Sequence, residues 1–84
     1  MEDKNLAVTK AGEMFYGTIL RDIPKECIEY LTYLSSRVGI CGEVYLTAFA
    51  YYNQAVLGMP CEDDLYKIPQ EEKDWFIKKG YYEK

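Results

Sequence analysis

The chain has 84 residues, of which 14 are acidic and 10 are basic, for a net charge of -4 at pH 7. This length has room for one hydrophobic core, so a single domain is expected over residues 1–84. The acidic excess disfavours proteins that bind by neutralising phosphates and proteins that attach to an anionic membrane surface. No apolar run approaches the roughly 20 residues that a membrane-spanning helix needs.

The cysteines argue against a disulfide framework and against a zinc site. Cys27, Cys41 and Cys61 are odd in number, and the chain has no histidine to complete a mixed set of four zinc ligands. No segment of signal-peptide form is evident, so the three thiols are expected to be small buried groups in a reducing compartment. We therefore expect a cytoplasmic protein without cofactor or metal.

The first predicted helix covers residues 6–20. Gly12 and Gly17 weaken it by about 1 kcal/mol each. Residues 15–20 also have the composition of a strand, but no second alternating run is evident to pair with them, so a helix is preferred. The apolar positions repeat with helical spacing on one side: Ala7, Val8, Ala11, Met14, Phe15 and Ile19.

A second helix is predicted over residues 24–38. Pro24 suits the first turn of a helix, which needs no backbone donor, and Gly39 suits a left-handed residue after the last turn. On a helical projection the side expected to face the core consists of Pro24, Cys27, Ile28, Leu31, Leu34, Ser35 and Val38. The side expected to face solvent consists of Lys25, Glu26, Glu29, Tyr30, Tyr33, Ser36 and Arg37.

The third predicted helix, residues 42–57, has a single charge, Glu43, and both of its faces are apolar. One face consists of Leu46, Phe49, Ala50, Asn53 and Leu57. The other is the candidate self-association surface and consists of Val44, Tyr45, Ala48, Tyr51, Tyr52 and Ala55. A helix of this kind is either the central element of a bundle or half of an oligomer interface.

Asn53 lies on the first of these two faces, where an unpaired amide would cost about 1–3 kcal/mol. Its partner is expected to be either a loop carbonyl of the same chain or the same asparagine of a second copy across a dimer axis. The residues favour neither.

Residues 58–68 are expected to form a loop, because Pro60 and acidic residues interrupt any periodicity. A last helix is predicted over residues 69–79, between Pro69 and Gly80, with Trp75 and Phe76 as its anchors. The loop and this helix together supply a candidate acidic surface: Glu62, Asp63, Asp64, Glu71, Glu72 and Asp74.

No constellation of catalytic residues is evident. Serine and cysteine lack histidine, their commonest base, and no phosphate-cradling glycine loop occurs. The acidic run at residues 62–64 lacks the alternating ligands of a calcium loop. The sequence therefore predicts a protein that is not an enzyme.

Residues 34–46 have the helix, glycine turn and helix of a helix-turn-helix motif. In that motif the second helix presents basic or amide side chains to DNA, whereas here it offers Glu43, tyrosines and alkyl groups. A plain helical hairpin is preferred.

These observations predict an all-α fold, a small bundle of about four helices with a charge-poor central helix. We expect a protein–protein interaction or regulatory module that forms a homodimer or binds another protein, because one helix has two apolar faces and nine tyrosines suit an interface. Two alternatives are an acidic inhibitor that mimics nucleic acid and a helix-turn-helix-like DNA-binding protein. A small apolar ligand held between helices is a third.

Overall fold

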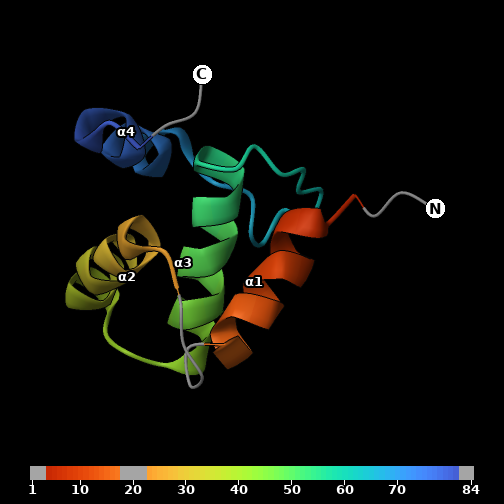
Figure 1. The fold of residues 1–84 in the computed structure, drawn as a ribbon, viewed down its shortest axis with the longest axis horizontal. Coiled ribbons are helices and arrows are strands. Elements are labelled where there is room, and N and C mark those ends of the chain that lie inside the picture. The colour runs from red at the N-terminus through yellow and green to blue at the C-terminus, as the bar shows by residue number, and fades with distance from the viewer. Residues whose placement is uncertain (1–3, 18–22, 82–84) are drawn as a thin grey trace.

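The computed structural model describes residues 4–17 and 23–81, which form four α-helices and, within these ranges, no strand. The helices are α1 (Leu6–Gly17), α2 (Lys25–Val38), α3 (Gly42–Ala55) and α4 (Gln70–Lys79), as Figure 1 shows. The predicted all-α bundle is confirmed. Residues 15–17 are helical, and residues 18–20 of the strand alternative lie outside the described residues. No helix in the described ranges is long and apolar enough to cross a bilayer.

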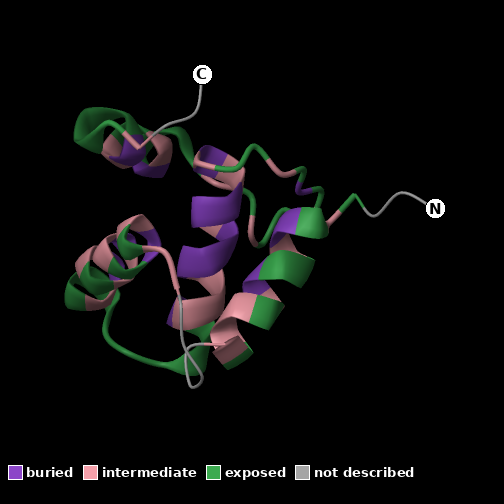
Figure 2. Cartoon of the chain, in the orientation of Figure 1, coloured by how far each residue is buried: buried purple, intermediate pink, exposed green. Residues whose placement is uncertain are grey.

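The charge-poor helix α3 is the central element of the bundle. It lies between α1 and α2, and α4 crosses near the end at which α3 finishes (Figure 1). Burial is concentrated on α3 (Figure 2), where seven of 14 residues are buried: Val44, Ala48, Phe49, Ala50, Tyr52, Asn53 and Ala55. Both apolar faces of the helix are thus covered within one chain, except at Leu57, which was predicted to belong to the helix but follows its end and is 44% exposed.

Small side chains and a returning loop hold α1 against α3. Ala7 and Ala11 are fully buried, and their small size lets the two helices approach closely. The loop after α3 comes back to the start of α1, where the Ala7 N–H donates to the Pro60 carbonyl at 3.1 Å. The Glu62 N–H donates to Oδ1 of Asn5 at 2.8 Å. These bonds pin the first turn of α1 to the loop.

Helix α2 buries a different set of residues from the one that its sequence pattern predicts. Cys27 and Leu34 of the predicted core side are buried, but Tyr30 of the predicted solvent side is fully buried too. Ile28, expected inside, is 42% exposed. Cys27, Tyr30 and Leu34 are three and four residues apart, so α2 has one buried face, as expected. This face is turned toward Tyr30 because α4 packs there, with the Phe76 ring centroid 4.5 Å from that of Tyr30.

Helix α4 is anchored as expected. Phe76 is fully buried, and Trp75 is half-buried with its ring stacked on Tyr33 at 5.1 Å between centroids. Gly80 ends the helix in the left-handed conformation, with φ of 80°.

The cysteines differ in their burial, although all three are free thiols. Cys27 and Cys61 are buried as expected. Cys41 is exposed, contrary to the expectation, because it lies on the turn before α3 rather than on a packed face.

Two glycine substitutions are expected to change stability in opposite directions. Gly39 has φ of 93°, a conformation that alanine adopts poorly, so Gly39→Ala should lower the free energy of unfolding by about 1–2 kcal/mol. Gly12 lies inside α1 with open space around its Cα, so Gly12→Ala should raise it by about 0.5–1 kcal/mol. Urea unfolding followed by circular dichroism measures both, and equal effects would contradict the assigned backbone conformation at Gly39.

Candidate functional site

The candidate self-association surface lies inside the monomer. Val44, Ala48, Tyr52 and Ala55 are at most 9% exposed, and Tyr45 and Tyr51 are half-buried. The remaining helices of the same chain cover this side of α3, so the exposed face that a dimer would use on this helix is not present in the monomer. The charge-poor helix was interpreted either as the central element of the bundle or as half of an oligomer interface, and its burial favours the first interpretation.

Asn53 finds a partner within the chain. Its side chain is fully buried, and Nδ2 donates to the Ala7 carbonyl in the first turn of α1 at 3.0 Å. The partner is a helix carbonyl rather than a loop carbonyl or a second asparagine. Oδ1 of Asn53 has no hydrogen-bond partner among the described residues. The amide therefore joins α3 to α1.

A groove of about 330 Å³ lies between the C-terminal half of α2, residues 43–51 of α3 and residues 65–72, and we call it the α2–α3 groove. Leu34 and Val44, both buried, contribute to its apolar lining. Two further lining residues, Val38 and Leu65, are 61% and 69% exposed. Large aliphatic side chains exposed around an apolar hollow are typical of a binding surface.

Tyr30, Arg37 and Glu72 form a hydrogen-bonded triad, of which Arg37 and Glu72 line the α2–α3 groove. Oε1 of Glu72 accepts a hydrogen bond of 2.7 Å from the Tyr30 hydroxyl, and Oε2 accepts one of 2.9 Å from Nη1 of Arg37. The same Nη1 also donates to the Tyr33 hydroxyl at 3.2 Å. The triad joins α2 to α4 and neutralises the carboxylate, which is 8% exposed as a residue.

The pKa values of Tyr30 and Arg37 are both raised, for different reasons. Burial is the main cause for Tyr30. It raises the pKa of the Tyr30 hydroxyl, and the hydrogen bond to the Glu72 carboxylate raises this pKa further. The same carboxylate raises the pKa of the Arg37 guanidinium, first through its hydrogen bond. Tyr30 is therefore a neutral donor and Arg37 a fixed cation at neutral pH, and both act as structural partners of Glu72.

The tyrosines and one thiol should make the fold sensitive to alkali. Burial raises the pKa of Tyr52 to about 12, and it also raises the pKa values of Tyr30 and Cys27. These groups ionise at lower pH in the unfolded chain than in the folded one. The free energy of unfolding therefore has its full value below their unfolded pKa values and decreases as the pH rises above them. The free energy of unfolding should therefore fall above about pH 9–10, by up to about 1.4 kcal/mol per group and pH unit.

Urea unfolding between pH 8 and pH 11 measures this loss. Tyr52→Phe is the control, because it removes one titrating group and should flatten the decline above about pH 10. A free energy of unfolding that stays constant over this range would contradict the burial of these groups.

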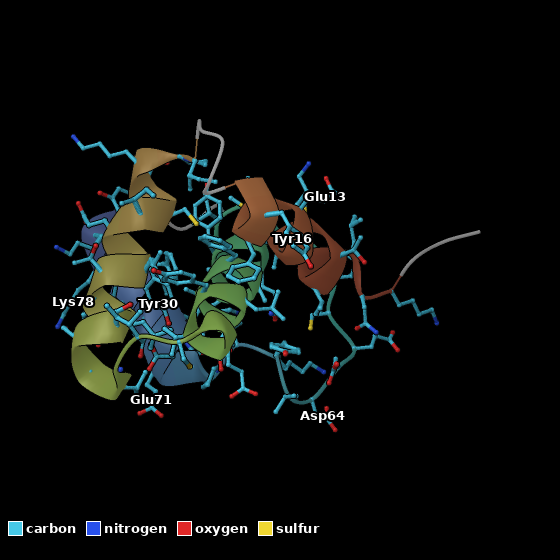
Figure 3. All side chains as sticks on the ribbon, turned by 90° about the horizontal axis from the view of Figure 1, so that it is seen from below. Glu13, Tyr16, Tyr30, Asp64, Glu71 and Lys78 are labelled. Atoms are coloured by element: carbon cyan, nitrogen blue, oxygen red, sulfur yellow. The ribbon has the colours of Figure 1, made fainter. Side chains whose placement is uncertain are left out.

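The candidate acidic residues fall into two groups. Figure 3 shows Asp64 on the loop and Glu71 on α4, apart from each other along one edge of the molecule. Glu72 is not a surface residue, in contrast to the prediction, because Tyr30 and Arg37 enclose its carboxylate. Of the other five, Asp63 is half-buried and four are exposed: Glu62, Asp64, Glu71 and Asp74.

The role of Glu72 was missed from the sequence, although α2 carries a signal for it. Tyr30 and Arg37 are seven residues apart, two helical turns, and so lie on the same face of α2. A hydroxyl and a guanidinium in one row are suitable partners for a single carboxylate. The sequence does not indicate which of several acidic residues would meet them.

The helical hairpin at residues 34–46 does not present its second helix to solvent. Residues Gly39–Cys41 join α2 to α3, and the second helix of the hairpin is the buried centre of the bundle. A recognition helix has to enter the major groove of DNA, for which one long face must be free. The burial of α3 gives the DNA-binding alternative no support.

Comparison of the chain with protein-family models, with curated proteins and with solved structures finds no match to any of them.

Proposed function

We propose that this chain is a non-enzymatic protein-interaction module that binds its partner in the α2–α3 groove. The observation that carries the proposal is the exposure of Val38 and Leu65 beside an apolar hollow, while larger side chains of the same chain are fully buried. Removing apolar surface from water stabilises an association by about 25 cal/mol per Å² before the costs of binding are counted. A partner that covers both residues gains from this effect.

The polar groups of the groove support a binding role more than a catalytic one. Glu72 is engaged by two donors, and the raised pKa of Tyr30 keeps its hydroxyl from acting as a base at neutral pH. Catalysis needs a nucleophile beside a base, and no such pair lines the groove among the described residues. The free thiols suit a reducing compartment, and we propose a cytoplasmic location on this ground.

The acidic-mimic alternative has less support. A mimic of nucleic acid needs negative charges in a regular row, whereas one of the six candidate residues is buried and neutralised by Arg37. The other five lie on separate parts of the surface, the loop and α4.

A selection of random 16-residue peptides against the protein tests the proposed function. Peptides selected on the wild type should lose about tenfold or more in affinity on Leu65→Asp, because a charge replaces an aliphatic contact at the groove. Leu57→Asp is the matched control, since Leu57 is also an exposed leucine in a turn but lies beyond the far end of α3. Selected peptides that bind both variants as tightly as the wild type would refute the proposal.

A further inference from the structure

From the charges around the α2–α3 groove, we infer that its occupant is a positively charged amphipathic helix of a different protein, with an aliphatic side chain inserted between Val38 and Leu65. This inference rests on the proposed function, because it names the kind of partner that the same groove accepts.

The unpaired charges at the groove are mainly acidic. The one arginine of the lining, Arg37, is already paired with Glu72 at 2.9 Å. Glu43 also lines the groove, is exposed and makes no ion pair with another described residue. The lining therefore presents one uncompensated negative charge beside its apolar residues.

Two more exposed acidic residues, one on the loop and one on α4, are next in the chain to residues that line the groove. Asp64 precedes Leu65 and Glu71 precedes Glu72; both are exposed and unpaired among the described residues. Figure 3 shows these two side chains apart from each other along one edge of the molecule. Lys67 is the one exposed, unpaired base in this stretch of the loop. Three acidic groups against one base favour a partner with lysine or arginine around its apolar anchor.

The walls of the groove favour a helix as the occupant. Two walls are α2 and α3, whose backbone groups bond within their own helices, and the third consists of the loop residues Leu65, Tyr66 and Pro69 with Glu72 of α4. The described residues contain no strand. An extended segment would find no sheet edge here to pair with its own N–H and C=O groups. A helix satisfies its backbone internally and offers apolar anchors at intervals of three and four residues.

The size of the groove limits how much of the partner it accepts. Its volume of about 330 Å³ is at the lower end of the roughly 300–1,000 Å³ of ligand sites. It therefore has room for an anchoring side chain, while the remainder of the partner helix would lie over Val38 and Leu65.

A second copy of this chain is a poorer occupant. In a two-fold dimer the same patch faces itself, so the unpaired Glu43 of each copy would lie in one interface. Like charges in such positions oppose association, and the net charge of -4 on each copy adds to the repulsion. A basic segment of a foreign protein experiences the opposite effect.

Two synthetic 18-residue helical peptides test the inference, one with leucines on one face and lysines on the other, and a matched one with glutamates in place of the lysines. Binding is measured by fluorescence anisotropy at about 50 mM and 300 mM salt. The lysine peptide should bind at least about tenfold more tightly than the glutamate peptide at low salt. Glu43→Lys should narrow this preference by about two- to fivefold, the effect of one surface pair.

Leu65→Asp separates docking from general electrostatic attraction. The variant adds a negative charge, so unspecific binding of the lysine peptide would become tighter, whereas docking in the groove should become about tenfold weaker. Leu57→Asp adds the same charge away from the groove and should not weaken binding. Circular dichroism of both variants checks that the fold is retained, as expected for leucines exposed in turns.

Three outcomes would overturn the inference. If both peptides bind equally and both are weakened by Leu65→Asp, the groove binds proteins without charge preference, and the proposed function stands alone. If Leu65→Asp leaves the lysine peptide unweakened, the attraction is unspecific, and the selected peptides decide the proposed function separately. If light scattering over a hundredfold concentration range gives a wild-type dimer that Leu65→Asp dissociates, the occupant is a second copy.

Discussion

Replacement of Tyr30 by alanine is expected to lower the free energy of unfolding by about 3–5 kcal/mol, the usual cost of removing a buried aromatic ring. The Tyr30 ring is fully buried and lies against the rings of Phe76 and Trp75, at centroid distances of 4.5 and 5.1 Å. The change opens a cavity between α2 and α4 and removes one of the two donors to Glu72. Domains are stable by only about 5–15 kcal/mol, so the variant should unfold at much lower urea concentration.

Two further variants separate packing from hydrogen bonding at this position. Tyr30→Phe keeps the ring and removes the hydroxyl, so it should cost about 1–2 kcal/mol, the price of an unmade bond to a carboxylate that retains Arg37. Tyr16→Ala serves as the matched control, because Tyr16 is 72% exposed and its loss should change stability by less than about 0.5 kcal/mol. Similar losses for Tyr30→Ala and Tyr16→Ala would contradict the packing of α4 on α2.

Introduction of glutamate at Ala48 is expected to destabilise the monomer by more than about 4 kcal/mol. Ala48 is fully buried in the hydrophobic cluster around α3. A glutamate there must either carry an unpaired charge into the core or push the neighbouring helices apart, and both are costly. Loss of the helical circular dichroism signal and of a cooperative urea transition measures the effect.

The same variant decides between the two readings of the charge-poor helix. If α3 were half of a dimer interface, Ala48→Glu would dissociate a dimer into folded monomers, which light scattering with circular dichroism would detect. Thr32→Glu is the control on the exposed side of α2 and should change stability by no more than about 0.5 kcal/mol. A folded, monomeric Ala48→Glu protein derived from a wild-type dimer would contradict the core position of Ala48.

Local chemistry made the helix limits predictable. Pro24 and Pro69 fix a backbone angle that suits a helix start, and they directly precede α2 and α4. Gly39 and Gly80 have positive φ angles and directly follow the same helices. Each of these effects acts within a few residues of the chain, so it can be read before any tertiary contact is known.

The face that each helix buries is less predictable, because it depends on which helix arrives from elsewhere in the chain. The side chains of Tyr30 and Glu72 end in a polar group, and the sequence pattern of each helix predicts that both are at the surface. In the fold they meet across 42 residues and satisfy each other by a hydrogen bond of 2.7 Å. A helical projection counts only neighbours along one helix and therefore misses this partner.

The sequence by itself determined an all-α fold, the positions of its helices and a charge-poor third helix, because these depend on periodicity and on proline and glycine at helix ends. Only the tertiary structure decided that both faces of α3 lie inside the monomer and that Val38 and Leu65 stay exposed beside a groove. The physical reason is that burial depends on how the whole chain packs. Helices α1, α2 and α4 all pack on α3, and their arrangement leaves some apolar residues uncovered.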